Sequence, residues 1–264
     1  MSTIGVVVFS FGGMRSLEMC LESVRWADRV IILHLGAGEP PVQKDGSPSD
    51  KIERASSMEQ VGQRFREMKT DWVLHLWGEE RLDKKLQEEI VSLCKKGGAR
   101  SSRTYRLEVR SRLLNRWVRG SLWGPSPALR LSAGLQDLSR GWWHGTSGKA
   151  KGGAPLLQGW IEDYSVEQLG YGLGQMNNFS TLCAERLAGE GIRFGAVSMV
   201  VYSFWVGARL LTMNRVVAKG LAGVAFSILA GYTVLLAGAK RWEKGIKVQG
   251  VLSKRQNSVA DRGD

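Results

Sequence analysis

Two adjacent carboxylates and a guanidinium form the first group in the sequence that could do chemistry: Glu79, Glu80 and Arg81. A cation of the Mg²⁺ or Mn²⁺ type is usually held by one or two carboxylates together with substrate phosphates. Glu79 could supply one such ligand, and Glu80 a second if the chain turns toward the site. The same residues could instead form a solvated helix start, where the helix dipole favours acidic side chains.

The three histidines are too dispersed along the chain to predict a metal cluster. His34 ends an apolar run, where a lone histidine is more often a hydrogen-bonded structural residue than a ligand. His75 alternates with apolar neighbours, so we expect it to be buried against a helix. His144 follows two tryptophans and either takes part in chemistry or caps an aromatic cluster.

Three apolar runs would position these groups, and they predict strands at residues 4–9, 30–35 and 72–76. Helices are predicted after each strand, from the spacing of apolar residues around 17–24, 58–68 and 82–93, with a loop at 36–50. Alternating strands and helices indicate an α/β fold with a parallel sheet. Ligands of such sheets bind beyond the carboxyl ends of the strands, which here are residues 10–15, 34–39 and 76–81.

At those positions the sequence resembles the nucleotide-sugar half of inverting family 2 glycosyltransferases of the GT-A type. The segments concerned are VVVFSFGG, CLESVRWADRVIILHLGAGE and TDWVLHLWGEERL. Within that family the chain is similar to the lipopolysaccharide core β-1,4-glucosyltransferase type, through NRWVRGSLWGPSPALRL, WWH and NNFSTLCAERL. The resemblance covers about residues 4 to 243, and CLESVRWAD and DWVLHL followed by EERL are its more specific parts.

The resemblance implies a GT-A-like, Rossmann-type mixed sheet flanked by helices, which binds a nucleotide-sugar donor. Inverting transfer needs a base for the acceptor hydroxyl, positive charge for the departing diphosphate, and in-line placement. The predicted metal ligand, for Mg²⁺ or Mn²⁺, is Glu79. The predicted catalytic residues are His144 and Glu80. The predicted donor-binding residues are Ser10, His34, Gly36, Glu39, Trp77, Arg119 and Arg130.

The chain departs from the family pattern at several polar positions. The metal-binding D-x-D motif is here Trp77-Gly78-Glu79, which keeps only the second acidic position. The carboxylate that ends the family's second strand is replaced by His34, and the glutamate after the later histidine by Gly145. Trp77 could stack on a sugar or base, and Arg119 and Arg130 could neutralise the diphosphate in place of a metal.

Composition bounds these predictions. With 43% hydrophobic and 23% charged residues, the 264-residue chain is neither disordered nor collagen-like. A net charge of +12 points to anionic partners. The sequence holds no nucleic-acid-binding motif, so we expect no nucleic-acid partner. Three scattered cysteines exclude a disulfide framework and fit a reducing compartment.

The C-terminal part has a different character. Residues 220–239 form an uncharged run of 20 residues, and residues 194–208 a shorter one of 15. Residues 194–264 carry ten Lys and Arg against three Asp and Glu, a net charge of +7. Such segments suit the cytoplasmic face of an anionic membrane, but a buried helical hairpin or an oligomer interface fits them as well. The resemblance also implies membrane-associated C-terminal helices.

The sequence thus predicts a donor and acceptor domain (1–193), a membrane-associated helical region (194–247) and a polar tail (248–264) that is disordered from residue 254. The predicted function is transfer of a sugar from a nucleotide-sugar donor to a lipid-linked or lipopolysaccharide-core acceptor. Its predicted location is the cytoplasmic face of the inner membrane, where the protein is either peripheral or anchored by its C-terminal part, since the 20-residue run is long enough to span a bilayer. The alternative is a relative without activity that acts as a binding or scaffold protein at the membrane surface, because of the altered acidic motif.

Overall fold

The computed structural model describes residues 3–35, 50–54, 63, 67, 70–95, 104–122, 128–133, 154–191, 195–213 and 220–260. In chain order its elements are β1 (Ile4–Ser10), α1 (Met14–Ser23), β2 (Arg29–His34), β3 (Asp50–Arg54), β4 (Trp72–Trp77), β5 (Glu80–Leu82), α3 (Lys84–Lys95), β6 (Thr104–Leu113), β7 (Arg116–Arg119), β8 (Ala128–Ala133), β9 (Leu156–Asp163), α5 (Leu169–Gly189), α6 (Ala196–Met213) and α7 (Leu221–Ala260).

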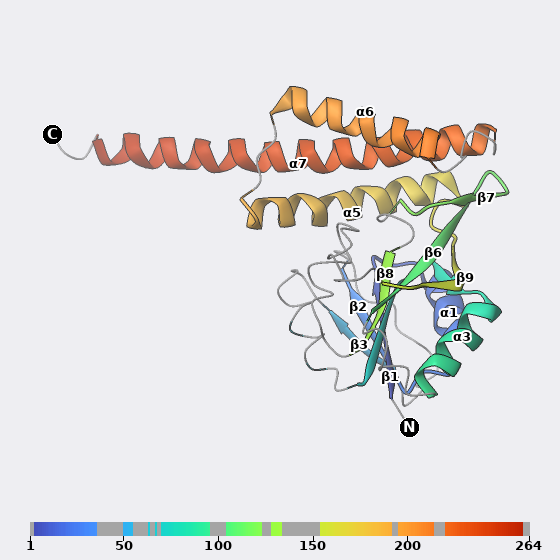
Figure 1. Cartoon of the computed structure of the whole chain (residues 1–264). Helices are drawn as coiled ribbons and strands as arrows, with labels where there is room; N and C mark the ends of the chain where they lie inside the picture. The colour runs from blue at the N-terminus through green and yellow to red at the C-terminus, as the bar shows by residue number, and fades with distance from the viewer. Residues whose placement is uncertain are drawn as a thin grey trace.

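The sheet has a parallel half and a half in which most pairs are antiparallel. Its strand order is β3-β2-β1-β4-β8-β6-β9-β5, with β7 paired to β6 at the side. β1 pairs in parallel with both β2 and β4, and β2 in parallel with β3. In the other half β8 is antiparallel to β4 and β6, while β6 and β9 run parallel. The α/β fold class with a mixed sheet flanked by helices and a C-terminal apolar helix is therefore confirmed (Figure 1).

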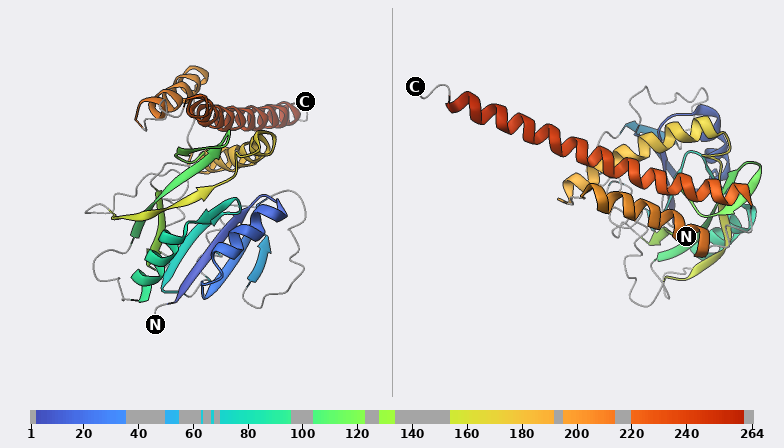
Figure 2. Two further views of the ribbon diagram at one scale, coloured as in Figure 1. Left: turned by 90° about the vertical axis from the view of Figure 1, so that its right-hand side faces the viewer. Right: turned by 90° about the horizontal axis from the view of Figure 1, so that it is seen from above.

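Each face of the parallel half is covered by its own helices. One core joins alternate residues of β1, such as Val6 and Val8, to α1 and α3. The other joins Val7 and Phe9 to α5 and to the start of α7, through Phe179 and Phe226. Burial on both faces explains why the strands read as continuous apolar runs, without alternation. Figure 2 shows α5 and α7 stacked on one side of the sheet and α6 outside them.

The third predicted helix starts later than expected. Residues 80–82 form β5, antiparallel to β9, and α3 begins only at Lys84. The reason is Asp83, whose Oδ1 accepts a hydrogen bond from the backbone N–H of Leu86 at 3.0 Å, a capping contact. The helix predicted around 58–68 and the loop predicted at 36–50 lie almost wholly outside the described residues.

The C-terminal helices share the core of the first part of the chain. Ala222, Phe226 and Ala230 of α7 are buried in the core that contains strand residues. The predicted boundary at residue 193 therefore separates two stretches of sequence that pack together. α7 also runs to Ala260, into the tail that we expected to be disordered from residue 254. Once a helix is formed, each added residue gains a hydrogen bond, which favours such an extension.

Candidate functional site

The strand order marks one place on the sheet for a ligand. From β1 the chain moves to β2 and β3 on one side, and then returns to β4 on the other side of β1. The loops that follow β1 and β4 therefore leave the sheet next to each other at the carboxyl edge, where open α/β sheets bind ligands. These loops are residues 11–13 and 78–79, two of the three segments that the sequence predicted.

Glycine shapes both loops. Gly12 and Gly13 have φ angles of +113° and +115°, which disfavour residues with a side chain. A Cβ atom at Gly13 would lie only 2.4 Å from the hydroxyl oxygen of Tyr171 in α5. Gly78 donates its N–H to the carbonyl of Phe9 at 2.8 Å, which ties the β4 loop to β1. Where β1 and β4 end, the backbone therefore carries no side chains at Gly12, Gly13 and Gly78, and it packs closely against Tyr171 and β1.

Glu79 lies in this edge and is almost fully buried, with 3% of its surface exposed. The Tyr171 hydroxyl lies 2.6 Å from Glu79 Oε1 and 2.9 Å from the Gly12 carbonyl oxygen. A phenol has only one proton to donate. Both short contacts become hydrogen bonds when Glu79 is protonated and donates to Tyr171, which then donates to Gly12.

Burial raises the pKa of Glu79 to about 7, and the nearby charges of Asp163 and Glu80 add to this rise. The hydrogen bond from Tyr171 acts in the opposite direction. Burial also raises the pKa of the Tyr171 phenol, with Glu79 as the next cause. The site therefore holds a carboxyl group that gains or loses its proton near neutral pH.

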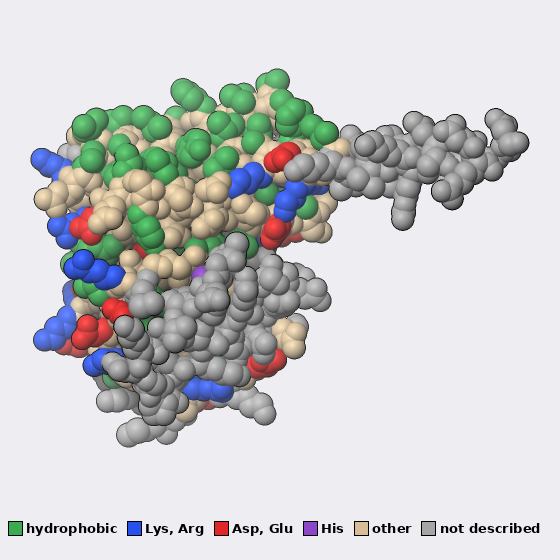
Figure 3. Space-filling model, turned by 180° about the vertical axis from the view of Figure 1, so that it is seen from behind, with side chains coloured by type: hydrophobic (Ala, Val, Ile, Leu, Met, Phe, Trp, Pro, Cys, Tyr) green, Lys and Arg blue, Asp and Glu red, His purple; other side chains and the backbone are tan. Residues whose placement is uncertain are grey.

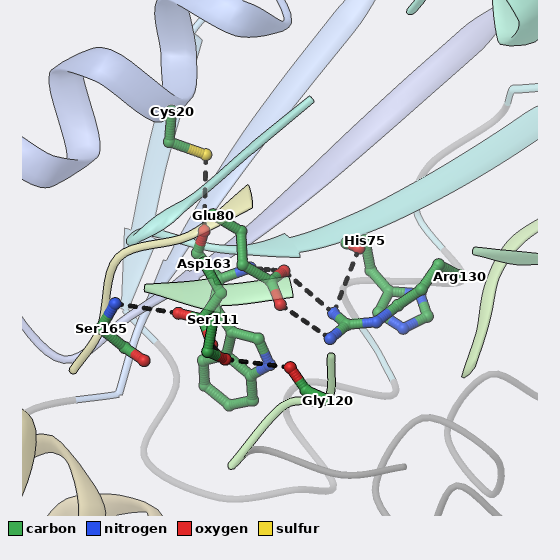
Figure 4. Close-up of polar contacts among 9 residues, drawn as sticks. Cys20, His75, Glu80, Ser111, Gly120, Arg130, Asp163 and Ser165 are labelled. Atoms are coloured by element: carbon green, nitrogen blue, oxygen red, sulfur yellow. Dashed lines mark hydrogen bonds and ion pairs between the residues drawn. The ribbon is translucent and has the colours of Figure 1, made fainter. Parts of the chain in front are cut away.

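Glu80 has a different environment, although it is the next residue. Its Oε1 accepts a hydrogen bond from Arg130 Nη2 at 2.8 Å, and its Oε2 accepts one from Arg130 Nη1 at 3.1 Å (Figure 4). Oε2 also accepts the backbone N–H of Trp77 at 2.8 Å, which closes the turn that presents Glu79. Burial raises the pKa of Glu80 to about 7, while the Arg130 guanidinium opposes that rise. This two-pronged contact is the geometry of an ion pair.

These contacts change the roles predicted for Glu80 and Arg130. Both side chains are buried, and they point at each other inside the protein. Arg130 also donates to the carbonyl of His75 at 3.5 Å. The carboxylate predicted as catalytic and the guanidinium predicted to bind the donor instead satisfy one another. They hold the end of β4 in place.

Trp77 is also placed differently from the prediction. Its ring is 2% exposed and packs among Phe9, Phe11 and Phe179, with ring centroids 5.4 to 5.6 Å away. The residue at the first position of the altered D-x-D motif is therefore part of the core. Its ring offers no open surface for stacking on a sugar or base. An indole buries well among aromatic side chains, and this explains its position.

The other predicted residues divide into three groups. Ser10 and His34 lie side by side at the ends of β1 and β2, buried beside the glycine loop, and Ser10 Oγ accepts the N–H of Gly12 at 3.1 Å. Arg119 lies on β7 with its side chain 52% exposed and pairs with Glu108 of β6. Gly36, Glu39 and His144 lie outside the described residues.

Two residues of the site were not predicted. Tyr171 lies near the start of α5, and its contact with Glu79 joins residues 92 positions apart. Asp163, at the end of β9, is buried and accepts hydrogen bonds from the Ser111 hydroxyl at 2.7 Å and the Ser165 backbone at 2.9 Å (Figure 4). Burial raises the pKa of Asp163. The sequence signal for Asp163 is its position two residues before Ser165, because an aspartate can accept a hydrogen bond from the backbone N–H two residues later.

Within the described residues, no group of three or more His, Cys, Asp or Glu side chains is arranged to hold a metal ion. Among the described residues, Glu79 would be the carboxylate ligand of a cation of the Mg²⁺ or Mn²⁺ type, because such ions take one or two carboxylates and fill their other positions with substrate phosphates and water. Glu79 must lose its proton first, so the fit depends on pH near neutrality.

No family model matches the chain, and no curated protein matches it. Solved structures with some likeness include S. aureus TarS 1-349 in complex with UDP, at 8% identity and a TM-score of 0.41 over 92% of each chain. TarS 1-349 in complex with UDP-GlcNAc aligns at 12% identity and a TM-score of 0.30, over 46% of this chain and 38% of that one. Likeness at this level establishes neither a family nor an activity, so the function has to be argued from the chain's own residues.

Proposed function

We propose that the chain is an inverting GT-A-type glycosyltransferase, which moves a sugar from a nucleotide-sugar donor to an acceptor. The observation that carries this proposal is the edge between β1 and β4. There a bare glycine turn and the buried carboxyl group of Glu79 meet at the point where the strand order reverses. The ordered sequence segments that resemble family 2 support the same activity, because this edge is made from the first and third of them.

In this proposal each residue has a defined task. The glycine turn lets the donor's phosphates approach the backbone closely, and the protein contributes Glu79 as the one carboxylate ligand of a shared Mg²⁺ or Mn²⁺ ion. Such an ion supplies positive charge for the departing nucleotide diphosphate. Glu80 and Arg130 position the turn that carries Glu79, and Tyr171 contacts Glu79 until the donor binds. His144 remains the proposed base for the acceptor hydroxyl.

The proposed acceptor is a lipid-linked sugar or a lipopolysaccharide core, met at the cytoplasmic face of the inner membrane. Supporting this choice are the basic, apolar C-terminal helices and the resemblance to the lipopolysaccharide core β-1,4-glucosyltransferase type. Described residues Leu221–Ile246 form a helix long and apolar enough to cross a membrane by length and composition. These features support a reaction close to a lipid surface.

Calorimetric titration with a panel of nucleotide sugars, with and without Mn²⁺, tests the proposal. We expect saturable binding of one donor, strengthened by Mn²⁺ above pH 7, in the unaltered protein. Glu79→Gln should lose the Mn²⁺ effect and the transfer activity, while Glu18→Gln, an exposed carboxyl group on α1, should keep both. Absence of donor binding by a folded protein would refute the proposal.

Two specific observations favour a second function, a membrane-surface binding or scaffold protein without activity. Trp77 is locked in the core, and Glu79 is covered by Tyr171. This alternative predicts a folded protein that binds membranes but no nucleotide sugar.

A variant of the proposed transferase mechanism uses Arg and Lys side chains in place of the metal ion to neutralise the diphosphate. It predicts transfer activity that survives a chelator.

A further inference from the structure

The outer surface of α6 and α7 is apolar and uncovered. On α7 the exposed residues fall at helical spacing along one line over 26 residues, namely Leu221, Val224, Ile228, Tyr232, Trp242 and Ile246. On α6 the most exposed apolar side chain is Phe204, at 78%, and its exposed neighbours are Val197, Val200 and Val201. Figure 3 shows these side chains gathered over α6 and α7. We call this set the α6–α7 face.

The opposite side of α7 is firmly held by the rest of the protein. Phe226 is fully buried in the aromatic core, and 44% of the most apolar part of the stretch Leu221–Ile246 is buried within the protein. Lys240 Nζ donates to Asn177 Oδ1 and Thr181 Oγ1 of α5, both at 2.7 Å, and Lys244 pairs with Glu185 of the same helix at 3.1 Å. To cross a bilayer, α7 would have to leave α5 and expose this core.

α6 is attached to α7 by close backbone packing. A Cβ atom on Gly231 would lie 2.8 Å from the carbonyl oxygen of Ser203, and one on Gly207 would lie 3.1 Å from that of Ser227. Glycine at these two positions lets the backbones of α6 and α7 pack closely against each other. Glycines lie between the two helices, while large apolar residues such as Phe204 and Ile228 are exposed on their outer side.

The chemistry of the surface favours an anionic lipid bilayer over a protein partner. Described residues 195–208 and 220–239 carry no charge, while Arg209 and Arg241 follow the uncharged stretches. Exposed aromatic side chains accompany them: Tyr202 stacks on Trp205 at 5.8 Å, and Arg209 lies 5.0 Å over the Trp205 ring. Aromatic and basic side chains around an apolar centre are typical of helices that lie in a membrane interface.

We propose that the α6–α7 face docks on an anionic lipid bilayer with both helices lying in the plane of the membrane, and that α7 does not span it. β1 runs from the far side of the molecule toward α5, α7 and α6 (Figure 1). The Gly12–Tyr171 contact joins its carboxyl edge to α5, the helix on which α7 packs. The candidate site therefore lies on the membrane side of the sheet. Docking itself does not depend on the proposed function; only the idea that the same membrane carries the sugar acceptor does.

Sedimentation with phosphatidylcholine vesicles, with and without phosphatidylglycerol, tests docking. We expect the unaltered protein to bind, and to bind more tightly when phosphatidylglycerol is present. Phe204→Glu and Ile228→Glu should each weaken binding about tenfold, because a charge replaces an inserted apolar side chain. Leu156→Glu, at an apolar residue that is 42% exposed on β9, is the matched control and should bind as before.

The in-plane arrangement is tested with a fluorescent NBD label on Leu221→Cys or Ile246→Cys. Dithionite added outside the vesicles should quench the label at both ends of the stretch, because neither end crosses the bilayer. Protection of one end would show that α7 spans and would overturn the in-plane arrangement.

Two other results would overturn docking itself. One is a folded protein that does not sediment with either kind of vesicle. The other is a stable dimer, detected by light scattering, that Phe204→Glu separates into monomers. Donor binding by the same variants is measured separately, so loss of docking and failure of the proposed activity can be told apart.

Discussion

The edge that carries Glu79 and the α6–α7 face depart in opposite ways from the usual distribution, in which charged side chains are exposed and large apolar ones are buried. At the edge, carboxyl groups are buried in the interior, while on the face large apolar groups are exposed to solvent. Both arrangements cost free energy in the isolated protein, so buried polar groups and exposed apolar patches are the informative features of a fold. The edge offsets its cost with internal hydrogen bonds, whereas the face has no cover within the described residues.

The largest effect is expected at the buried ion pair, since its loss would leave an uncompensated charge. Arg130→Met should lower the free energy of unfolding by about 4 kcal/mol, because Glu80 loses both of its contacts with Arg130. Arg119→Met should cost less than about 1 kcal/mol, because the Arg119 side chain is 52% exposed and Glu108 keeps its ion pair with Arg110. Urea unfolding of both variants measures this contrast. Equal effects would mean that the interior pair is not special.

Two residues of α7 sharpen the contrast between its two sides. Phe226→Ala should cost at least about 3 kcal/mol, because the ring is fully buried in the core. Ile228→Ala, at a residue that is 64% exposed, should change stability by less than about 0.5 kcal/mol. Thermal unfolding in the absence of lipid tests this. A large cost at Ile228 would show that the α6–α7 face is covered in solution.

The pH dependence of stability should report the buried Glu79. The pKa of Glu79 is about 7 in the folded protein and 4.5 for an ordinary glutamate, so folding favours the protonated form. The stabilising contribution is therefore full below pH 4.5 and is lost as the pH rises through 7. Relative to the unaltered protein, Glu79→Gln should gain up to about 3 kcal/mol between pH 4.5 and pH 8. Unfolding at both pH values checks it, with Glu18→Gln showing no such change.

The smallest expected effect concerns the hydrogen bond from Tyr171. Tyr171→Phe removes the hydroxyl that contacts both Glu79 and Gly12, and should cost about 1 to 2 kcal/mol of stability at pH 8. Because that bond lowers the pKa of Glu79, its loss should move the Mn²⁺ dependence of donor binding to higher pH. Calorimetry across pH measures this shift. An unchanged pH profile would mean that Tyr171 serves packing alone.

The sequence determined the parallel half of the fold and the place of the site. Runs such as residues 4–9 and 72–76 are apolar throughout, because their strands are buried on both faces, so their pattern is local and readable. The glycine turn and Glu79 follow directly from the ends of those strands. Burial of His75 was likewise expected from its position between apolar neighbours.

Only the tertiary structure decided what each site residue does. Glu79 and Glu80 are adjacent in sequence, yet one meets Tyr171 from α5 and the other Arg130 from β8. Partners 50 and 92 positions away leave no local pattern that spacing could reveal. For the same reason the burial of Trp77 and the division of α7 into a core side and an apolar outer side could not be deduced from composition. They depend on which surfaces meet when the helices pack on the sheet.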